Sequence, residues 1–367
     1  MRIFLKKIRK KIFKQATLPA RNEKEIATLP PGGYGTSVET SLNSRCCSDY
    51  DGDPELFHWG MFDPAKRLSQ DTVRTVMQSA QICRFTNHRL EITTDENILT
   101  FIADNTLTGI QRNWVMIESG MQQQAVSLAC AALGIGVVYN RMGENGTLLS
   151  EHDLATARLM IDAMKPSYGG SYWSKQPPTG RRAWLRGNLP DPTRESNTPL
   201  LQTFRSLQIN HHGGRQISDQ SISQLLWAAR GRTPHLYKSK PWGMTIPASR
   251  GRQDASSVYL LKNGQLFLYI NQTRNRPTHS IRPSLQFRPE TRSRLKRLLP
   301  ACECIIILAA NELSGIAFCE IGYQLLNVLV QARALDLQFG ATLLDDEQME
   351  IGASKAECRP LAAVYLT

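Results

Sequence analysis

Apolar residues in the C-terminal half of the chain recur with the spacing of regular secondary structure. From Ile222 to Ala229 they return every three or four positions, which predicts one buried helix face. Ser218 or Asp219 can cap this helix at its start, and Gly231 can end it. The pattern therefore predicts a capped, amphipathic helix ahead of a β-rich region.

The β-rich region that follows shows the pattern of strands and one long helix. Two β-type runs are separated by Lys262-Asn263-Gly264, and an Asn-Gly pair in this position is typical of a tight hairpin turn. A long, mostly apolar run predicts a helix over 316–337. The predicted strands cover 257–261, 266–270, 304–308 and 361–367.

The N-terminal half shows a thinner version of the same order. Helices are predicted over 70–81, 118–133 and 151–163, and β-type runs occupy 90–94 and 98–103. In both halves the helices are segregated from antiparallel hairpins and do not alternate with parallel strands. We therefore expect an α+β fold in which each half has an antiparallel sheet flanked by helices.

Composition divides the chain into four segments. Residues 1–34 hold a basic tail and a Gly/Pro-rich lead into the first half, which covers 35–173. A stretch rich in Pro, Gly and charge, without apolar periodicity, predicts a linker over 174–197. The second half then covers 198–367.

Three matched points indicate an internal duplication. In each half they lie ahead of the first helix, between that helix and the first strand, and at the start of the long apolar helix. The pairs are 45–48 with 205–208, 84–92 with 246–254, and 118–122 with 320–324. Any one match could arise by chance, but the shared order favours duplication.

The formal net charge of +12 is concentrated at the N-terminus, where the first fourteen residues carry seven Lys or Arg and no acid. Such a tail either forms a basic amphipathic helix in weak contact with an anionic membrane surface or stays solvated. A second basic run, 288–297, has the pattern of a solvated helix face. No nucleic-acid-binding motif accompanies either run, so we expect no nucleic-acid partner.

Other motifs exclude several function classes. The eight cysteines are scattered and no secretory signal is present, which favours a reduced, cytoplasmic protein. His211-His212 and the Cys302–Cys304 pair lack further ligands at suitable spacing, so no metal site is expected. The glycine-rich loops of dinucleotide and nucleotide-phosphate binding are absent, and so is the serine elbow of hydrolases.

The second half combines motifs that occur together in one family. They are ISQLLWAARG over 222–231, Pro247 followed by Ser249 and Gln253, and Gly322 followed by Leu326-Asn327. Together these motifs resemble the nitroreductase superfamily, especially the branch of dehydrogenases that act on azoline-containing peptides. The resemblance covers 198–367 well and 41–167 more weakly.

This resemblance implies an FMN-dependent enzyme, usually homodimeric, whose flavins bind where two subunits meet. A fused tandem would supply both sides of that interface as an intrachain pseudo-dimer. A monomer would then suffice, although a homo-oligomer is not excluded. The implied reaction moves hydride or electrons between a nicotinamide donor and a small-molecule or peptide acceptor that the sequence does not identify.

The resemblance also implies which residues hold FMN. Candidates for the phosphate are Arg45, Arg141, Arg205, Ser206 and Gln208. Candidates for the flavin ring are Asn87, Arg89, Pro247, Ala248, Ser249, Arg250 and Gln253. The second arginine of the family pattern is replaced by Gln208 in one half and Ser48 in the other. These losses favour the alternative, a catalytically inactive flavin-binding or partner-binding protein, in which Arg205 is a surface arginine and the loops are plain turns.

The stretch 229–247 combines basic and aromatic residues in a predicted loop that leads to Pro247. Loops of this composition beside a rigid scaffold often bind ligands. His235 and Tyr237 are candidate catalytic proton donors to a reduced substrate. A lone His or Tyr serves packing more often than catalysis, so both interpretations stay open.

Overall fold

The computed structural model describes most of both halves, and all statements below concern these residues. The described residues are 25–26, 36–44, 47–48, 62–63, 65–79, 82–141, 145–163, 187–193, 196–237, 240–247, 255–273, 276–284, 289–298, 302–344, 351–352 and 357–367.

The first half builds one sheet with a long helix against it. Its helices are α2 (Val38–Ser44), α4 (Gln70–Ser79) and α5 (Gly109–Leu133). Its sheet strands are β2 (Cys47–Ser48), β4 (Leu90–Asp95), β5 (Ile98–Asp104), β6 (Ile135–Arg141), β7 (Thr147–Leu148) and β8 (Asp153–Ala163). The order is β2-β6-β8-β5-β4, with β7 on β8, and only the β2–β6 pair is parallel. A separate short ladder joins β1 (Glu25–Ile26) and β3 (Lys66–Arg67).

The second half builds a larger antiparallel sheet. Its helices are α7 (Leu200–Arg205), α8 (Asp219–Arg230), α9 (Pro289–Leu298) and α10 (Gly315–Ala334). Its sheet strands are β9 (Asn210–His211), β12 (Ser256–Lys262), β13 (Gln265–Thr273), β14 (Arg276–Pro283), β15 (Cys304–Ala310), β16 (Phe339–Leu343), β17 (Ile351–Gly352) and β18 (Glu357–Leu366). The order is β14-β13-β12-β15-β18-β16-β9, with β17 on β18. A separate hairpin pairs β10 (Arg232–Tyr237) with β11 (Lys240–Met244).

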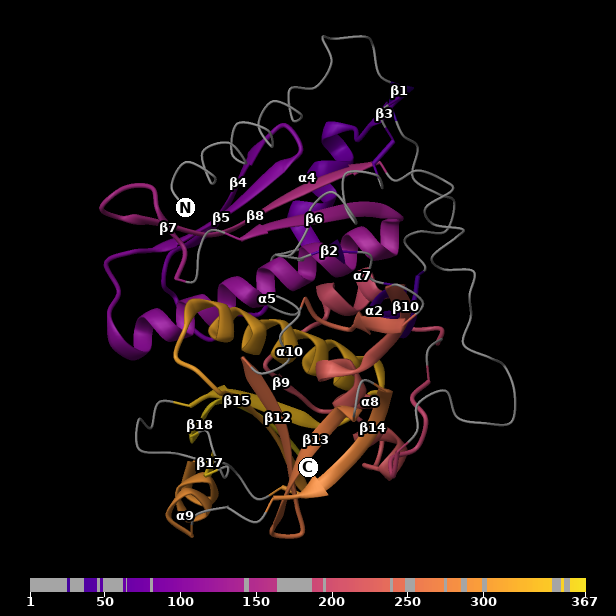
Figure 1. The fold of residues 1–367 in the computed structure, drawn as a ribbon, viewed down its shortest axis with the longest axis vertical. Helices are drawn as coiled ribbons and strands as arrows, with labels where there is room; N and C mark the ends of the chain where they lie inside the picture. Colours follow the sequence, from indigo (N-terminus) through magenta and orange to yellow (C-terminus); the bar gives the residue numbers. More distant parts are fainter. Residues whose placement is uncertain are drawn as a thin grey trace.

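The two sheets share one strand order. In the first half β4, β5, β8, β6 and β2 lie side by side, and β12, β15, β18, β16 and β9 do so in the second. The second half adds β13 and β14 at one edge, α9 before β15, and the β10–β11 hairpin after α8. Figure 1 shows the first-half sheet above and the second-half sheet below, with α5 and α10 between them.

The helices α5 and α10 cross in close contact at two glycines. A Cβ atom at Gly120 would collide with the carbonyl of Cys319, and one at Gly322 would collide with the carbonyl of Ile117. Cys319 stands as far after Ile117 in the sequence as Gly322 stands after Gly120. Reciprocal contacts of this kind are the mark of a two-fold interface.

A second reciprocal set lies where the two halves begin. The N–H of Val38 donates to the carbonyl of Thr198 at 3.1 Å, and the N–H of Leu200 donates to the carbonyl of Thr36 at 2.9 Å. The hydroxyls of the same two threonines donate to carbonyls in the last turns of α5 and α10, at 3.0 and 3.5 Å. The fold is thus α+β, with two halves related as an intrachain pseudo-dimer.

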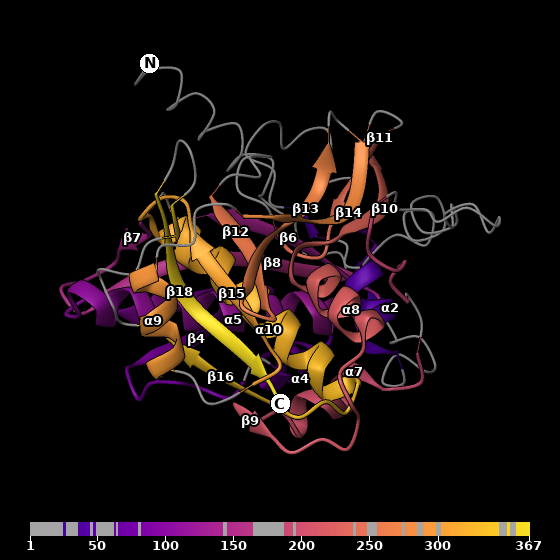
Figure 2. The same cartoon turned by 90° about the horizontal axis from the view of Figure 1, so that it is seen from below.

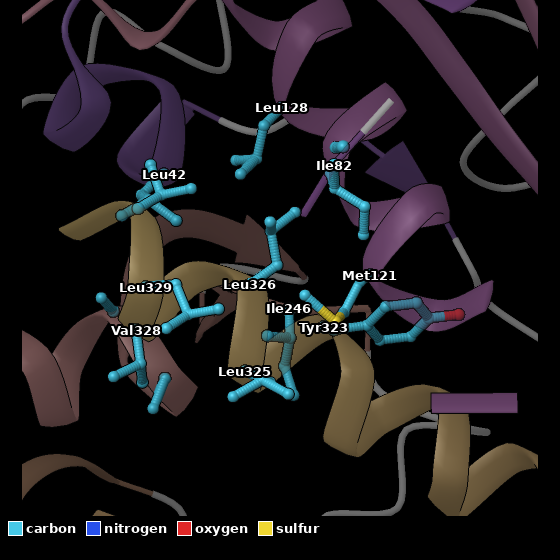
Figure 3. Close-up of a cluster of buried hydrophobic side chains, with 14 of the residues drawn as sticks. Leu42, Ile82, Met121, Leu128, Ile246, Tyr323, Leu325, Leu326, Val328 and Leu329 are labelled. Carbon is cyan, nitrogen blue, oxygen red and sulfur yellow. The ribbon is translucent and has the colours of Figure 1, made fainter. Parts of the chain in front are cut away.

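One apolar core runs through the contact between the halves. Figure 3 shows Met121 and Leu128 of α5 packed close to Leu326 and Leu329 of α10. Among the described helices, α10 has the length and apolar composition to cross a membrane, but 94% of that apolar window is buried inside the protein. We therefore interpret α10 as the core helix of the pseudo-dimer.

Several predicted elements of the second half are confirmed with their local signals. The hydroxyl of Ser218 accepts the N–H of Ser221 at 3.1 Å and caps α8, and Gly231 follows its last residue. Asn263 and Gly264 have φ values of 51° and 74°, which a tight two-residue hairpin turn requires. β15, α10 and β18 confirm the other predicted strand, the long helix and the closing strand.

The predicted helix over 151–163 is wrong, because this segment is the strand β8. Its Ala, Leu and Met residues favour a helix by propensity alone. In the fold it lies between β5 and β6, and most of its side chains are buried on both faces of the sheet. A strand buried on both faces loses the alternation that would have identified it, and pairing on both sides overrides propensity.

Two further expectations need correction. α5 begins at Gly109, well before the predicted start at Glu118, and Ile110, Trp114 and Ile117 already recur there at helical spacing. The stretch 229–247, predicted as a loop, contains the β10–β11 hairpin, whose register shifts between Thr233 and Leu236. Prolines in both strands conceal this hairpin in the sequence, since Pro interrupts regular strand pairing.

Candidate functional site

The root of the second half's predicted flavin loop is held between α5 and α10. Gln124 Nε2 donates to the carbonyl of Thr245 and to Asn327 Oδ1, both at 2.9 Å. Asn327 Nδ2 also donates to Thr245, at 3.1 Å, so residues of both halves fix this carbonyl. Pro247, two positions later, is also buried. The other members of this predicted loop lie outside the described residues: Ala248, Ser249, Arg250 and Gln253.

The equivalent loop of the first half is bound to a buried carboxylate. Glu118, fully buried on α5, accepts the N–H of Phe85 at 2.6 Å and that of Thr86 at 2.8 Å. Its second oxygen accepts from Thr86 Oγ1 at 2.7 Å and from Arg84 Nη2 at 2.9 Å. These four donors therefore serve an internal anion and are not available to a ligand.

Asn87 and Arg89, the predicted ring contacts of the first half, are exposed. Arg89 Nε lies 2.8 Å from Glu91 Oε1, and its Nη2 lies 2.8 Å from Asp153 Oδ1. Hydrogen bonds to Glu91 first, and then to Asp153, raise the pKa of Arg89. Because two carboxylates already neutralise this guanidinium, it has little charge to offer a phosphate.

The predicted phosphate ligands of the second half are turned toward solvent. Arg205, the last residue of α7, is exposed, and so is Gln208. Ser206 Oγ donates to the carbonyl of Thr203 at 3.2 Å, within its own helix end. Arg141 is the last residue of β6, and the structure describes only its backbone. Arg45 lies outside the described residues.

The strand that follows each long helix also differs between the halves. Gly136 is the second residue of β6 and Gly340 is the second residue of β16. A Cβ atom at Gly340 would collide with the ring of Tyr365, so the second half fills this face of β16 with its own side chain. Arg141 lies five residues after Gly136, and the residue five positions after Gly340 is Asp345. An aspartate repels the phosphate that an arginine would attract.

His235 and Tyr237 lie on β10, and their side chains are outside what the structure describes. The backbone of Tyr237 is opposite Lys240, and His235 falls within the register shift of the hairpin. β10 contacts α2 of the first half, and both hairpin strands contact β14. Figure 2 shows the hairpin beside α2 and α8. The hairpin therefore bridges the two halves.

The base of the hairpin contains two buried cations. Arg230 Nη1 lies 3.2 Å from Oε2 of the buried Glu320. Arg232 bonds Gln272, and burial, followed by the charge of Arg230, lowers the pKa of Arg232 to about 10. Glu320 thus corresponds to Glu118, since each is a buried carboxylate on a long helix that pairs with an arginine. The partner of Glu118 is Arg84, ahead of β4, and the partner of Glu320 is Arg230, ahead of β10.

Three buried side-chain oxygen atoms on α5 have no hydrogen-bond partner, and one of them, Gln122 Oε1, has the equally unpartnered Gln324 Oε1 as its counterpart on α10. The other two, Gln124 Oε1 and Ser127 Oγ, belong to residues without a polar counterpart. The two residues are three positions apart and project from the same side of the helix. The sequence prediction missed them because each is an ordinary polar residue in a long helix. Alignment of Glu118 with Glu320 could have found them, since the second half has Leu326 and Leu329 at these places.

A further repeat was also missed in the sequence. Asn-x-Leu-Thr-Gly-Ile covers 105–110 and Asn-x-Leu-Ser-Gly-Ile covers 311–316, and each opens a long helix. Thr108 and Ser314 occupy the two cap positions. The repeat supports the correspondence of α5 with α10.

Comparison with models of known protein families finds no match, and comparison with curated proteins finds none either. A solved structure from Ralstonia eutropha JMP134, provisionally named a nitroreductase, is 18% identical with a TM-score of 0.38, over 52% of this chain and 96% of that chain. Another from Anabaena variabilis ATCC 29413, provisionally named likewise, is 9% identical with a TM-score of 0.48, over 73% of this chain and 68% of that chain. Both are likenesses of fold, at identities too low to transfer an activity.

Proposed function

We propose that the chain is an FMN-dependent oxidoreductase of the nitroreductase type, in which one polypeptide supplies both sides of the flavin site. The observation that carries this proposal is the hydrogen bond from Gln124 of the first half to the carbonyl of Thr245, which lies two positions before Pro247 in the second half. The family resemblance implies that the same loop reaches a flavin across the subunit interface of a homodimer. The bond to Thr245, just before that loop, supports an equivalent arrangement within one chain.

The face of α5 around Gln124 suits a polar, planar ligand. Gln124 Oε1 and Ser127 Oγ are buried without partners, and a flavin ring or ribityl chain carries groups that would satisfy them. We propose Arg45 and Arg141 as phosphate ligands, because a phosphate dianion favours arginine. The proposed ring contacts are Pro247, Ala248, Ser249, Arg250 and Gln253.

Bound FMN would supply hydride or electron transfer between a nicotinamide donor and a small-molecule or peptide acceptor. The protein's part is to orient the ring, exclude water and move a proton. The β10–β11 hairpin contacts α2, and α2 contacts α5 and is followed directly by Arg45. We propose His235 and Tyr237 on this hairpin as proton donors to the reduced acceptor.

A second candidate function has its own supporting observation. Arg89 is neutralised by two carboxylates, and the N–H donors of the first-half loop are bound to Glu118, so several groups expected near a flavin are committed within the protein. A chain that had lost flavin chemistry at both faces would be a catalytically inactive, partner-binding protein. This alternative predicts a colourless chain with the same fold.

The visible spectrum of the purified chain tests the proposal. We expect flavin bands near ~370 and ~450 nm, release of FMN on denaturation, and oxidation of NADH or NADPH when an electron acceptor is added. Bands without turnover would support a flavin carrier. A colourless chain that does not take up added FMN would contradict both flavin functions and support the inactive, partner-binding protein.

A further inference from the structure

Gln124 and Ser127 differ from Gln122, the other α5 residue with an unpartnered buried oxygen, because the counterpart of Gln122 on α10 is the equally unpartnered Gln324. Gln123, one position away, donates to Ser119 Oγ at 3.1 Å and accepts from Tyr323 OH at 2.6 Å. Gln124 bonds through Nε2, but its Oε1 has no partner, and neither has Ser127 Oγ. Both residues are almost completely buried. Leaving a buried polar atom without a partner destabilises the fold, so the fold tolerates a penalty that a ligand would remove.

The surroundings of these two residues come from both halves. The carbonyl bonded by Gln124 belongs to Thr245, at the root of the Pro247 loop. α2 contacts both long helices, and Gln331 of α10 donates to Glu39 of α2 at 2.6 Å. β10 contacts α2 in turn. We call the face of α5 that carries Gln124 and Ser127 the polar face.

The equivalent face of α10 is apolar. Leu326 and Leu329 occupy the places relative to Glu320 that Gln124 and Ser127 occupy relative to Glu118. Both leucines are fully buried in the main core, together with Ile82 from the first-half loop. Figure 3 shows these side chains close together at the contact between the halves. This face is filled by the protein's own side chains.

The equivalent face also lacks the covering hairpin. Between α8 and the Pro247 loop the second half inserts β10 and β11, whereas only Ala80 and Gln81 separate α4 from Ile82 in the first half. The donors of the first-half loop are bound to Glu118, and Arg205 is exposed. The two halves thus differ in the polarity of these faces, and the β10–β11 hairpin has no counterpart in the first half.

We infer that the chain holds one flavin, not two, and that Gln124 Oε1 and Ser127 Oγ on the polar face make hydrogen bonds to it. This inference rests on the proposed function, and it adds two binding residues and a stoichiometry. Flavin offers a ring N–H to an acceptor such as Gln124 Oε1, and carbonyl and hydroxyl groups to a serine hydroxyl. Leu326 and Leu329 offer no such group, so no flavin binds at the equivalent, apolar face of α10.

The test compares two Ser→Ala substitutions on the same buried helix. Ser127→Ala removes an unpartnered hydroxyl, so we expect the free energy of unfolding of the flavin-free chain to stay level or rise, and FMN binding to weaken about three- to tenfold. Ser119→Ala is the matched control, since Ser119 Oγ bonds Thr156 Oγ1 at 2.6 Å. It should lower stability and leave the FMN dissociation constant unchanged.

Flavin quantitation separates failure of the inference from failure of the proposed function. One FMN per chain, with weaker binding only in Ser127→Ala, is the expected result. Two FMN per chain, or equal dissociation constants for Ser127→Ala and the wild type, would overturn the inference while the flavin enzyme stands. A wild-type chain that binds no FMN in a fluorescence titration would overturn the proposed function itself.

Discussion

Gly120 and Gly322 carry the tightest steric constraint on the contact between the halves. Any side chain at either position would collide with the main chain of the opposite helix, at Cys319 or at Ile117. Backbone atoms cannot move aside as the end of a flexible side chain can. The distance between α5 and α10, and with it the position of every group on the polar face, therefore depends on these two glycines.

Gly120→Ala should destabilise the whole chain, because the added methyl group forces the two long helices apart. Overpacking of this kind costs about 1–3 kcal/mol and occasionally more. Urea unfolding monitored by circular dichroism measures the change. Gly214→Ala is the control, since a Cβ there would have its nearest neighbour, Asp336 Oδ2, at 3.6 Å. Equal unfolding midpoints for the two variants would contradict the close crossing.

Asp336 predicts a pH dependence of stability. It follows α10 with φ of 55°, which asparagine also tolerates, and its carboxylate is bonded by His211 Nε2 and the N–H of Gly214, both at 3.3 Å. The bond to His211 first, and then that to Gly214, lower the pKa of Asp336 below its ordinary value of 3.8. A carboxylate with a lowered folded pKa stabilises the fold above its unfolded pKa, and this stabilisation is lost as the pH falls through the folded value.

We therefore expect Asp336→Asn to lower the thermal midpoint at pH 7 and to match the wild type more and more closely as the pH falls below about 4. Asp95→Asn, at the exposed end of β4, is the control for a simple change of net charge. A difference between Asp336→Asn and the wild type that stays constant from pH 7 to pH 3 would show that this carboxylate is not responsible.

At the scale of elements, two buried carboxylates connect each long helix to the segment that precedes β4 in the first half or β10 in the second. Glu118 binds the loop at Arg84 to Thr86, and Glu320 pairs with Arg230 at the end of α8. The repeat in the sequence aligned these two acids, and the structure explains why both are retained. A buried acid without its arginine would be strongly destabilising.

Elements whose signals are local were predictable from the sequence. The cap at Ser218, the turn at Asn263-Gly264 and the apolar run of α10 all act over a few neighbouring residues. β8 was not predictable, because its place between two other strands is set by residues far away in the chain. The β10–β11 hairpin was not predicted for a similar reason. Its prolines argue against regular strands, and its contacts with α2 and β14 come from residues distant in the chain.

The candidate site was only partly predictable. Pro247 was expected near a flavin from its motif, but the carbonyl of Thr245 that precedes it is bound by Gln124, which lies in the other half of the chain. Gln124 and Ser127 carry no motif of their own and acquire meaning only by contrast with Leu326 and Leu329. Arg89 was expected to contact a ligand, yet its partners Glu91 and Asp153 come together only through strand pairing.

At the scale of the whole molecule, the chain resembles a homodimer whose two subunits have been joined covalently. The two-fold contacts at Gly120 and Gly322, and at Thr36 and Thr198, are those of a symmetric pair. A true homodimer must change both faces together, because one gene encodes both. A joined chain can change each face separately, which permits one polar face with a hairpin and one apolar face that adds to the core.

A cut within the predicted linker should leave the two halves together. We expect a chain with a protease site inserted between Lys175 and Gln176, once cleaved, to elute as one species under native conditions, because the halves share a continuous apolar core. Size-exclusion chromatography with light scattering at decreasing concentration makes the measurement. The same cut in the Gly120→Ala chain should release the fragments at lower urea, because that substitution weakens the helix crossing. Fragments of the wild-type chain that separate on simple dilution would show that the halves are independent domains and would contradict the intrachain pseudo-dimer.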